Sequence, residues 1–126
     1  MRYVGYSEFY HDSGLAIISE NGEVEFATHG ERYSKKKNDP NIPQELWNMV
    51  NKDDHVSFYE DHKIKFDMRG GFDGLATLAY PKDAEYDTFH MHHESHCAAA
   101  FYTRPWESKD DTVLVSIDGV GELQTA

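Results

Sequence analysis

The sequence has little cysteine and little positive charge, and it lacks any long apolar run. Its 126 residues include one cysteine, Cys97, which excludes an internal disulfide framework and a zinc ribbon built on cysteine pairs. The 12 Lys and Arg residues stand against 23 Asp and Glu residues, giving a net charge of −11. This charge repels phosphate backbones and anionic membranes, so we expect no generic nucleic-acid or membrane-surface binding. No segment approaches the roughly 20 apolar residues that span a bilayer, and we expect a soluble, cytoplasmic protein.

The first 28 residues predict a three-strand meander. Residues 2–6, 15–18 and 24–27 are short extended or apolar segments of strand length. Between the second and third lies Asn21-Gly22, a dipeptide that readily takes the positive φ angles of a tight hairpin turn. We therefore expect the chain to begin with three antiparallel strands.

The remaining sequence predicts helix-strand units. A helix is expected over 44–50 with Pro43 in its first turn, and another over 93–102, where three consecutive alanines have high helix propensity. Residues 56–60 and 112–117 predict strands, the second of a buried type, and residues 61–86 contain several glycines and predict mostly loop. Strands followed by strand-helix alternation indicate the α/β class, with a mixed sheet.

Histidines gather at residues 90–96, which hold four of the eight in the sequence. On a helix, residues i and i+4 share a face, so His92 and His96 could place two imidazole nitrogens on one metal ion. Glu94 would project to the far side, which argues against the HExxH metalloprotease pattern. Asp118 closes an apolar segment and is the natural third ligand, and two imidazoles with one carboxylate suit iron or zinc. The same residues also fit a cluster of surface histidines and an Asp-Gly hairpin turn.

Two further polar segments could carry chemistry. His11, Asp12 and Ser13 offer a base, a carboxylate and a hydroxyl in the loop between the first two predicted strands. Arg32 and the lysines at 35–37 form the basic cluster of an acidic sequence, and they could hold a phosphate or carboxylate through charge-assisted hydrogen bonds. Each segment has a simpler interpretation as a solvated loop or turn.

Taken in order, these segments resemble the amino-terminal part of the O-carbamoyltransferases of the NodU and CmcH type. Four elements of that family have counterparts here: a His-Asp-Ser-like loop at 11–13, a Glu-Glu-Arg-Phe-x-x-x-Lys-like element at 30–37, an HHxxHAxxAF element at 92–101 and a strand ending in Asp-Gly-x-Gly-Glu at 117–122. Gly30 stands where the family has the first Glu of the second element. The resemblance covers most of the chain except about residues 51–88.

The resemblance implies a fold, an activity and a set of site residues. The fold is a partial actin and sugar-kinase-like (ribonuclease H-like) lobe over residues 1–126. The family makes carbamoyl-adenylate from carbamoyl phosphate and ATP, and then transfers the carbamoyl group to a hydroxyl of an acceptor. The implied catalytic residues are His11 and Asp12; the implied ligands of a divalent metal, preferably iron, are His92, His96 and Asp118; the implied substrate contacts are Arg32, Lys36, Lys37, Gly119 and Gly121.

Members of that family are several times longer than this sequence. The glycine-rich nucleotide loop and the YrdC-type domain that makes the adenylate have no counterpart here. We therefore expect a complementary carboxy-terminal polypeptide that carries them, as in the split genes of phages, or else a truncated remnant, with self-association where the partner is absent. The alternative is a non-catalytic metal-binding or interaction module that keeps the fold. The related tRNA threonylcarbamoyl-transfer activity needs a basic surface, which the net charge disfavours.

Overall fold

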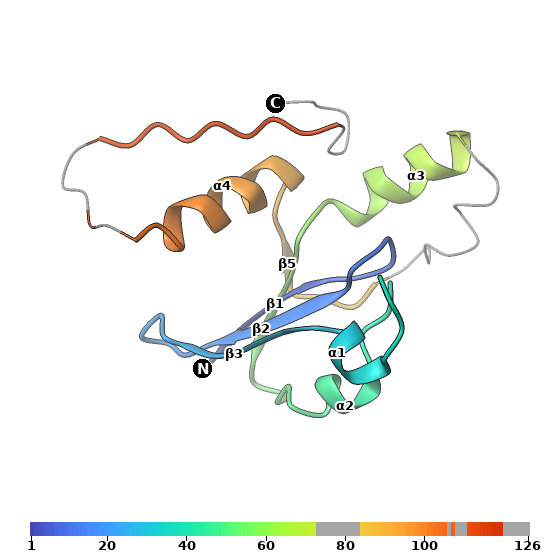
Figure 1. The fold of residues 1–126 in the computed structure, drawn as a ribbon, viewed down its shortest axis with the longest axis horizontal. Coiled ribbons are helices and arrows are strands. Elements are labelled where there is room, and N and C mark those ends of the chain that lie inside the picture. The colour runs from blue at the N-terminus through green and yellow to red at the C-terminus, as the bar shows by residue number, and fades with distance from the viewer. Residues whose placement is uncertain (73–83, 106, 108–110, 120–126) are drawn as a thin grey trace.

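The fold is built on a five-stranded mixed sheet (Figure 1). The computed structural model describes residues 1–72, 84–105, 107 and 111–119. In chain order the strands are β1 (Tyr3–Ser7), β2 (Gly14–Ile18), β3 (Val24–His29), β4 (His55–Phe58) and β5 (Thr88–Phe89), and their order in the sheet is β3-β2-β1-β4-β5. The first three strands are antiparallel neighbours, whereas β4 pairs in parallel with β1, and β5 pairs in parallel with β4. The predicted α/β class, with a mixed sheet that starts as a three-strand meander, is confirmed.

The helices lie on both sides of this sheet. They are α1 (Glu31–Ser34), α2 (Gln44–Trp47), α3 (His62–Phe72) and α4 (His92–Tyr102). In Figure 1, α1 and α2 lie below the sheet and α4 lies above it. Within the part of the chain that the structure describes, no helix is long and apolar enough to cross a membrane.

The hydrophobic core occupies the side of the sheet that faces α2. Alternate residues of a strand point to opposite faces, and the register pairs Val4 with Ile17 and Tyr6 with Phe58 on the same face. The buried apolar side chains are Val4, Tyr6, Leu15, Ile17, Ile42, Leu46 and Phe58. Ser7 of β1 consequently points to the other face, toward α4.

The hairpin between β2 and β3 forms where the sequence predicts it. Gly22 has a φ of 84°, a conformation that glycine adopts without steric cost. The turn is closed by two backbone hydrogen bonds, from the Ser19 N–H to the Glu23 carbonyl at 2.8 Å and from the Gly22 N–H to the Ser19 carbonyl at 3.0 Å. The Asn21-Gly22 signal therefore locates the turn correctly.

The predicted loop at 61–86 is wrong in its first part, because α3 runs from 62 to 72. Asp61 precedes the helix and caps it, because its carboxylate oxygen accepts the backbone N–H groups of Lys63 at 3.0 Å and Ile64 at 3.1 Å. An aspartate in this position satisfies N–H groups that have no partner within the helix. Gly70 and Gly71 lower helix propensity but do not end the helix.

The predicted buried strand at 112–117 is also wrong. The segment is extended but forms no strand, and three of its side chains are largely exposed: Val113 at 87%, Val115 at 75% and Ile117 at 80%. In Figure 1 it runs alongside α4, away from the sheet, whose outer strand on that side is β5. Apolar composition indicates that a segment can be buried. Within the described residues, no strand lies beside residues 112–117 to bury them.

The other predicted elements are confirmed, with shifted ends. Pro43 directly precedes α2, which is shorter than predicted, and Leu46 is fully buried. The strand predicted at 56–60 is β4 and ends at Phe58, so Glu60 lies beyond it. The helix predicted at 93–102 starts one residue earlier.

Candidate functional site

Two histidines lie on one face of α4. His92 is the first residue of the helix and His96 is four residues later, so their rings come together at a centroid distance of 4.7 Å. The helix begins here because Glu94 turns back and its carboxylate accepts the Met91 N–H at 3.1 Å. Glu94 is therefore used in capping and points away from the histidine pair, as the sequence predicts.

Asp118 completes a three-ligand cluster with these histidines. Its Oδ2 lies 2.7 Å from His92 Nε2 and 3.2 Å from His96 Nε2, and the two Nε2 atoms are 3.1 Å apart. Residue 118 is brought to the helix by the hydrogen bond between His93 Nδ1 and Ser116 Oγ at 2.7 Å. Among the described residues, this is the one group of His, Cys, Asp and Glu side chains with metal-binding geometry.

The spacing of the three atoms fits a divalent metal ion. Nitrogen and oxygen ligands lie about 2.1 Å from such an ion. At that bond length, neighbouring ligands are about 3.0 Å apart in octahedral geometry and about 3.4 Å apart in tetrahedral geometry. The three distances in the structure scatter around the octahedral value. If an ion were held by two imidazoles and one carboxylate, coordination positions would remain for a substrate.

The electrostatics of Asp118 agree with its place in this cluster. Hydrogen bonding from His92 lowers the pKa of the Asp118 carboxyl, and the Gly119 N–H, 2.6 Å from Oδ1, lowers it further. The carboxylate is therefore ionised and available as a ligand over the physiological pH range.

The cluster is open to solvent on one side. The side chain of His92 is 13% exposed, whereas those of His96 and Asp118 are 52% and 41% exposed. A structural metal site is usually closed, and an open one can exchange ligands. This donor set accepts zinc as well as iron, and the geometry does not favour iron.

A buried ion pair lies beside the Nδ1 atom of His92, whereas Asp118 lies beside its Nε2 atom. Glu60 is fully buried, and its Oε2 lies 3.2 Å from Lys65 Nζ and 3.6 Å from His92 Nδ1. A carboxylate beside the outer nitrogen of a metal-binding histidine orients the ring and raises its basicity. Sequence reasoning missed Glu60 and Lys65, although a polar residue just after an apolar strand is a recognisable signal in α/β sheets.

His11 and Asp12 lie in the loop between β1 and β2, where the sequence predicts them. His11 Nδ1 is 2.8 Å from Asp12 Oδ2, and Asp12 has a φ of 50°. Two backbone hydrogen bonds hold the loop against residues 39–40, which lie between α1 and α2. The Phe9 N–H donates to the Pro40 carbonyl at 2.7 Å, and the Ser13 N–H donates to the Asp39 carbonyl at 2.8 Å. Such anchoring stabilises the left-handed conformation of Asp12 and keeps the His-Asp pair in place.

Ser13 does not share in this pair. Its side chain is fully buried, and its hydroxyl donates to the Asn41 carbonyl at 2.9 Å. Gly30 packs directly against it, because a Cβ at Gly30 would lie 2.2 Å from Ser13 Oγ. Any side chain at position 30 would therefore clash with the Ser13 hydroxyl, which gives the glycine a structural reason.

One cavity joins the His-Asp pair to the three-ligand cluster. It has a volume of about 610 Å³ and is lined by residues from the β1–β2 loop, from the segment after β4, from α3 and α4, and from residues 118–119. The lining residues are Ser7, Tyr10, His11, Asp12, Tyr59, Lys65, His92, Ser95, His96, Asp118 and Gly119. Ser95 fixes α4 at this cavity, because its hydroxyl donates to the Tyr59 carbonyl at 2.7 Å.

The predicted basic contacts lie elsewhere. Arg32 is on α1, Lys36 and Lys37 follow that helix, and all three are exposed and outside the lining of the cavity. Figure 1 places α1 on the side of the sheet opposite α4. Gly119 lies at the cavity, and Gly121 is outside the described residues.

Comparisons with known proteins identify one distant relative and no family. The chain is 26% identical over 163 residues to the uncharacterized protein sll1178 of Synechocystis sp., an alignment that covers 97% of this chain and 26% of the relative. The chain thus spans about a quarter of the length of the curated relative it matches. No family model matches the sequence, and no solved structure matches it.

Proposed function

We propose that this chain is the amino-terminal lobe of an O-carbamoyltransferase and acts together with carboxy-terminal parts that supply the nucleotide loop and the adenylate-forming domain. One observation carries the proposal. His11 and Asp12, from the start of the chain, line the same cavity as His92, His96 and Asp118, from its end. Each of these residues lies in a motif that resembles the NodU and CmcH type of carbamoyltransferase.

The strand arrangement supports the same proposal. A mixed sheet with an antiparallel three-strand meander, continued by parallel strands, agrees with the partial actin and sugar-kinase-like lobe that the resemblance implies. The alignment covers 26% of the relative, so most of that protein lies outside the aligned part and leaves room for the lobe and the domain that the proposal requires.

In the proposed reaction, His11 is the general base. Its Nδ1 lies 2.8 Å from the Asp12 carboxylate, which orients the ring and leaves Nε2 to take the proton of the acceptor hydroxyl. The hydroxyl oxygen forms a bond to the carbamoyl carbon of carbamoyl-adenylate, and the bond from that carbon to the phosphate oxygen breaks. The products are the carbamoylated acceptor and AMP, and the proton remains on His11.

The three-ligand cluster would hold a divalent metal beside this reaction. When bound, the ion would polarise the carbonyl or neutralise the nucleotide phosphate, the role of a Lewis acid. His92, His96 and Asp118 would hold it at the cavity wall, and Glu60 would keep the His92 ring in position.

The activity test follows the carbamoyl group. The chain is mixed with the complementary polypeptide, ATP, radiolabelled carbamoyl phosphate and a panel of hydroxyl compounds, and labelled product is measured. We expect product only when both polypeptides are present, and a loss of roughly 100-fold or more with His11→Ala, the scale of a lost general base. The matched control is His29→Ala, an exposed histidine on β3 outside the cavity lining, which should keep full activity.

Two results would contradict this assignment. Turnover by the chain alone would mean that it holds a nucleotide site that the proposal assigns to the missing parts. Undiminished product with His11→Ala would remove the proposed base.

A second candidate is a non-catalytic metal-binding and interaction module. It is favoured by exposed apolar side chains at one end of the molecule, where Val113, Val115 and Ile117 are largely in solvent. Exposed apolar patches commonly mark interfaces. Under the carbamoyltransferase proposal, this segment is covered by the complementary polypeptide.

Sedimentation separates the two candidates. We expect the pure chain to self-associate at micromolar concentration, and to form a defined complex with the complementary polypeptide instead. Val113→Lys combined with Val115→Lys should prevent both, because two charges would have to lose their hydration in the interface. A chain that does not bind the complementary polypeptide would favour the stand-alone module, whose apolar segment would then face a different partner.

A further inference from the structure

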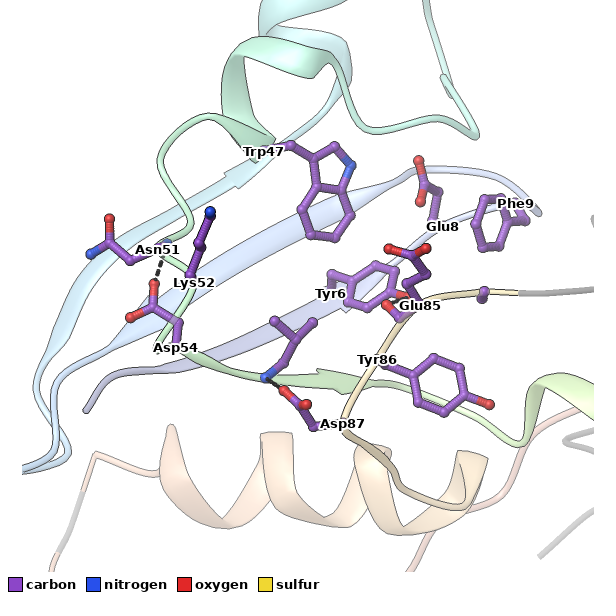
Figure 2. A pocket seen from close by; sticks show the side chains of 12 residues that line it. Tyr6, Glu8, Phe9, Trp47, Asn51, Lys52, Asp54, Glu85, Tyr86 and Asp87 are labelled. Atoms are coloured by element: carbon purple, nitrogen blue, oxygen red, sulfur yellow. Dashed lines mark hydrogen bonds between the residues drawn. The ribbon is translucent and has the colours of Figure 1, made fainter.

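A second cavity, of about 750 Å³, lies on the side of the sheet that faces α2 (Figure 2). Its walls come from β1 and the loop after it, from α2, from the segment before β4 and from residues 84–87. The lining residues are Tyr6, Glu8, Phe9, Trp47, Asn51, Lys52, Asp54, Val56, Ala84, Glu85, Tyr86 and Asp87. None of them lines the cavity that holds the histidine cluster.

Aromatic rings form much of this lining and are held by packing. Tyr6 and Trp47 meet edge to face at a centroid distance of 5.0 Å, and Tyr86 stacks on buried Phe58 at 5.6 Å with an interplanar angle of 9°. The Tyr6 hydroxyl donates to the Glu85 carbonyl at 3.2 Å. In Figure 2 the Trp47 ring extends from α2 toward Tyr6, with Glu8 and Glu85 beside the two rings. Ring faces carry partial negative charge and attract cations.

Carboxylates outnumber cations around these rings. Asp54 is neutralised by Arg2, whose Nη2 lies 2.5 Å from its Oδ2. Glu8, Glu85 and Asp87 remain, with Lys52 as the one cationic side chain of the lining. Burial raises the pKa of half-buried Glu8, although its carboxylate accepts the Ile42 N–H at 2.7 Å. A ligand cation would stabilise the charged form of Glu8.

We propose that this cavity binds a small organic cation, such as a primary or quaternary ammonium compound. Anionic ligands are disfavoured by the three carboxylates. A bare divalent metal is disfavoured as well, because the one metal-binding group among the described residues is the histidine cluster. Aromatic faces combined with nearby carboxylates are the recognition pattern for ammonium groups.

Fluorescence of Trp47 tests the proposal. The sequence contains two tryptophans, so the measurement uses Trp106→Phe, in which Trp47 is the remaining reporter. Choline is titrated against its uncharged carbon analogue, dimethylbutanol. We expect a saturable change with choline and an affinity at least roughly tenfold weaker for the analogue, which corresponds to one cation–π interaction.

Variants show whether the cavity itself is responsible. Glu8→Gln keeps an oxygen for the Ile42 N–H and removes the charge, so choline binding should weaken roughly threefold to tenfold. Glu23→Gln makes the same charge change in the exposed β2–β3 turn and should bind like the parent. Equal binding of choline and its analogue, an equal loss in both variants, or no saturable change would overturn the proposal. His96→Ala should leave choline binding unchanged, which separates this site from the proposed metal site.

Discussion

Replacement of His96 by alanine is expected to abolish stoichiometric metal binding. The chain as purified should carry about one divalent ion, and His96→Ala should weaken its affinity by at least about 100-fold, because loss of a ligand exceeds the roughly 10- to 100-fold effect of losing an outer-shell partner. The variant should remain folded, since the side chain is half exposed and alanine is the best helix former. Elemental analysis and titration calorimetry with zinc and, without oxygen, with iron measure the effect.

A histidine outside the cluster provides the control for this experiment. His29 on β3 is exposed, and His29→Ala makes the same chemical change without removing a proposed ligand. It should retain the metal content and affinity of the parent chain. Equal metal in the parent and in His96→Ala would show that the ion, if bound, lies elsewhere, and the interpretation as a cluster of surface histidines would then hold.

The second large effect is expected at Glu60. Glu60→Gln keeps the volume of the side chain but removes the carboxylate that lies 3.6 Å from His92 Nδ1, and metal affinity should fall by roughly 10- to 100-fold. The variant should also lose about 3–5 kcal/mol of stability, because Lys65 is left as a buried charge without its partner. Calorimetric metal titration and chemical unfolding measure the two effects separately.

Lys65→Met distinguishes positioning of His92 from general destabilisation. It breaks the same ion pair, whose Nζ–Oε2 distance is 3.2 Å, but leaves the Glu60 carboxylate beside His92. We expect a similar loss of stability and a change in metal affinity of no more than a few-fold. If both variants lost metal affinity to the same extent, the ion pair would support only the fold and Glu60 would have no specific role toward His92.

The features that could be predicted from the sequence are those with local causes. The β2–β3 turn depends on Asn21-Gly22, and α4 depends on a run of alanines, so short-range conformational preferences suffice for both. The meeting of His92 and His96 follows from helical spacing alone. The place of Asp118 after an apolar segment predicts that it approaches the two histidines, and the structure brings it there although that segment is not a strand.

The features that the sequence did not reveal depend on tertiary neighbours. Whether residues 112–117 are buried depends on a neighbouring strand, which the apolar pattern does not specify. The buried ion pair of Glu60 and Lys65 connects the segment after β4 to α3. The sequence does not predict this helix, because Gly70 and Gly71 favour a loop there. The aromatic cavity draws on four separate segments, none with a recognisable motif, so it appears only when the chain is folded.

We propose that the cavity lined by His11 and Asp12 also contains a metal site. Anomalous X-ray diffraction tests this proposal most directly, using crystals of the chain grown with one equivalent of zinc or cobalt. We expect a single anomalous peak about 2.0–2.2 Å from His92 Nε2, His96 Nε2 and a carboxylate oxygen of Asp118. A peak at other residues, or none in crystals in which these three side chains are ordered, would contradict it.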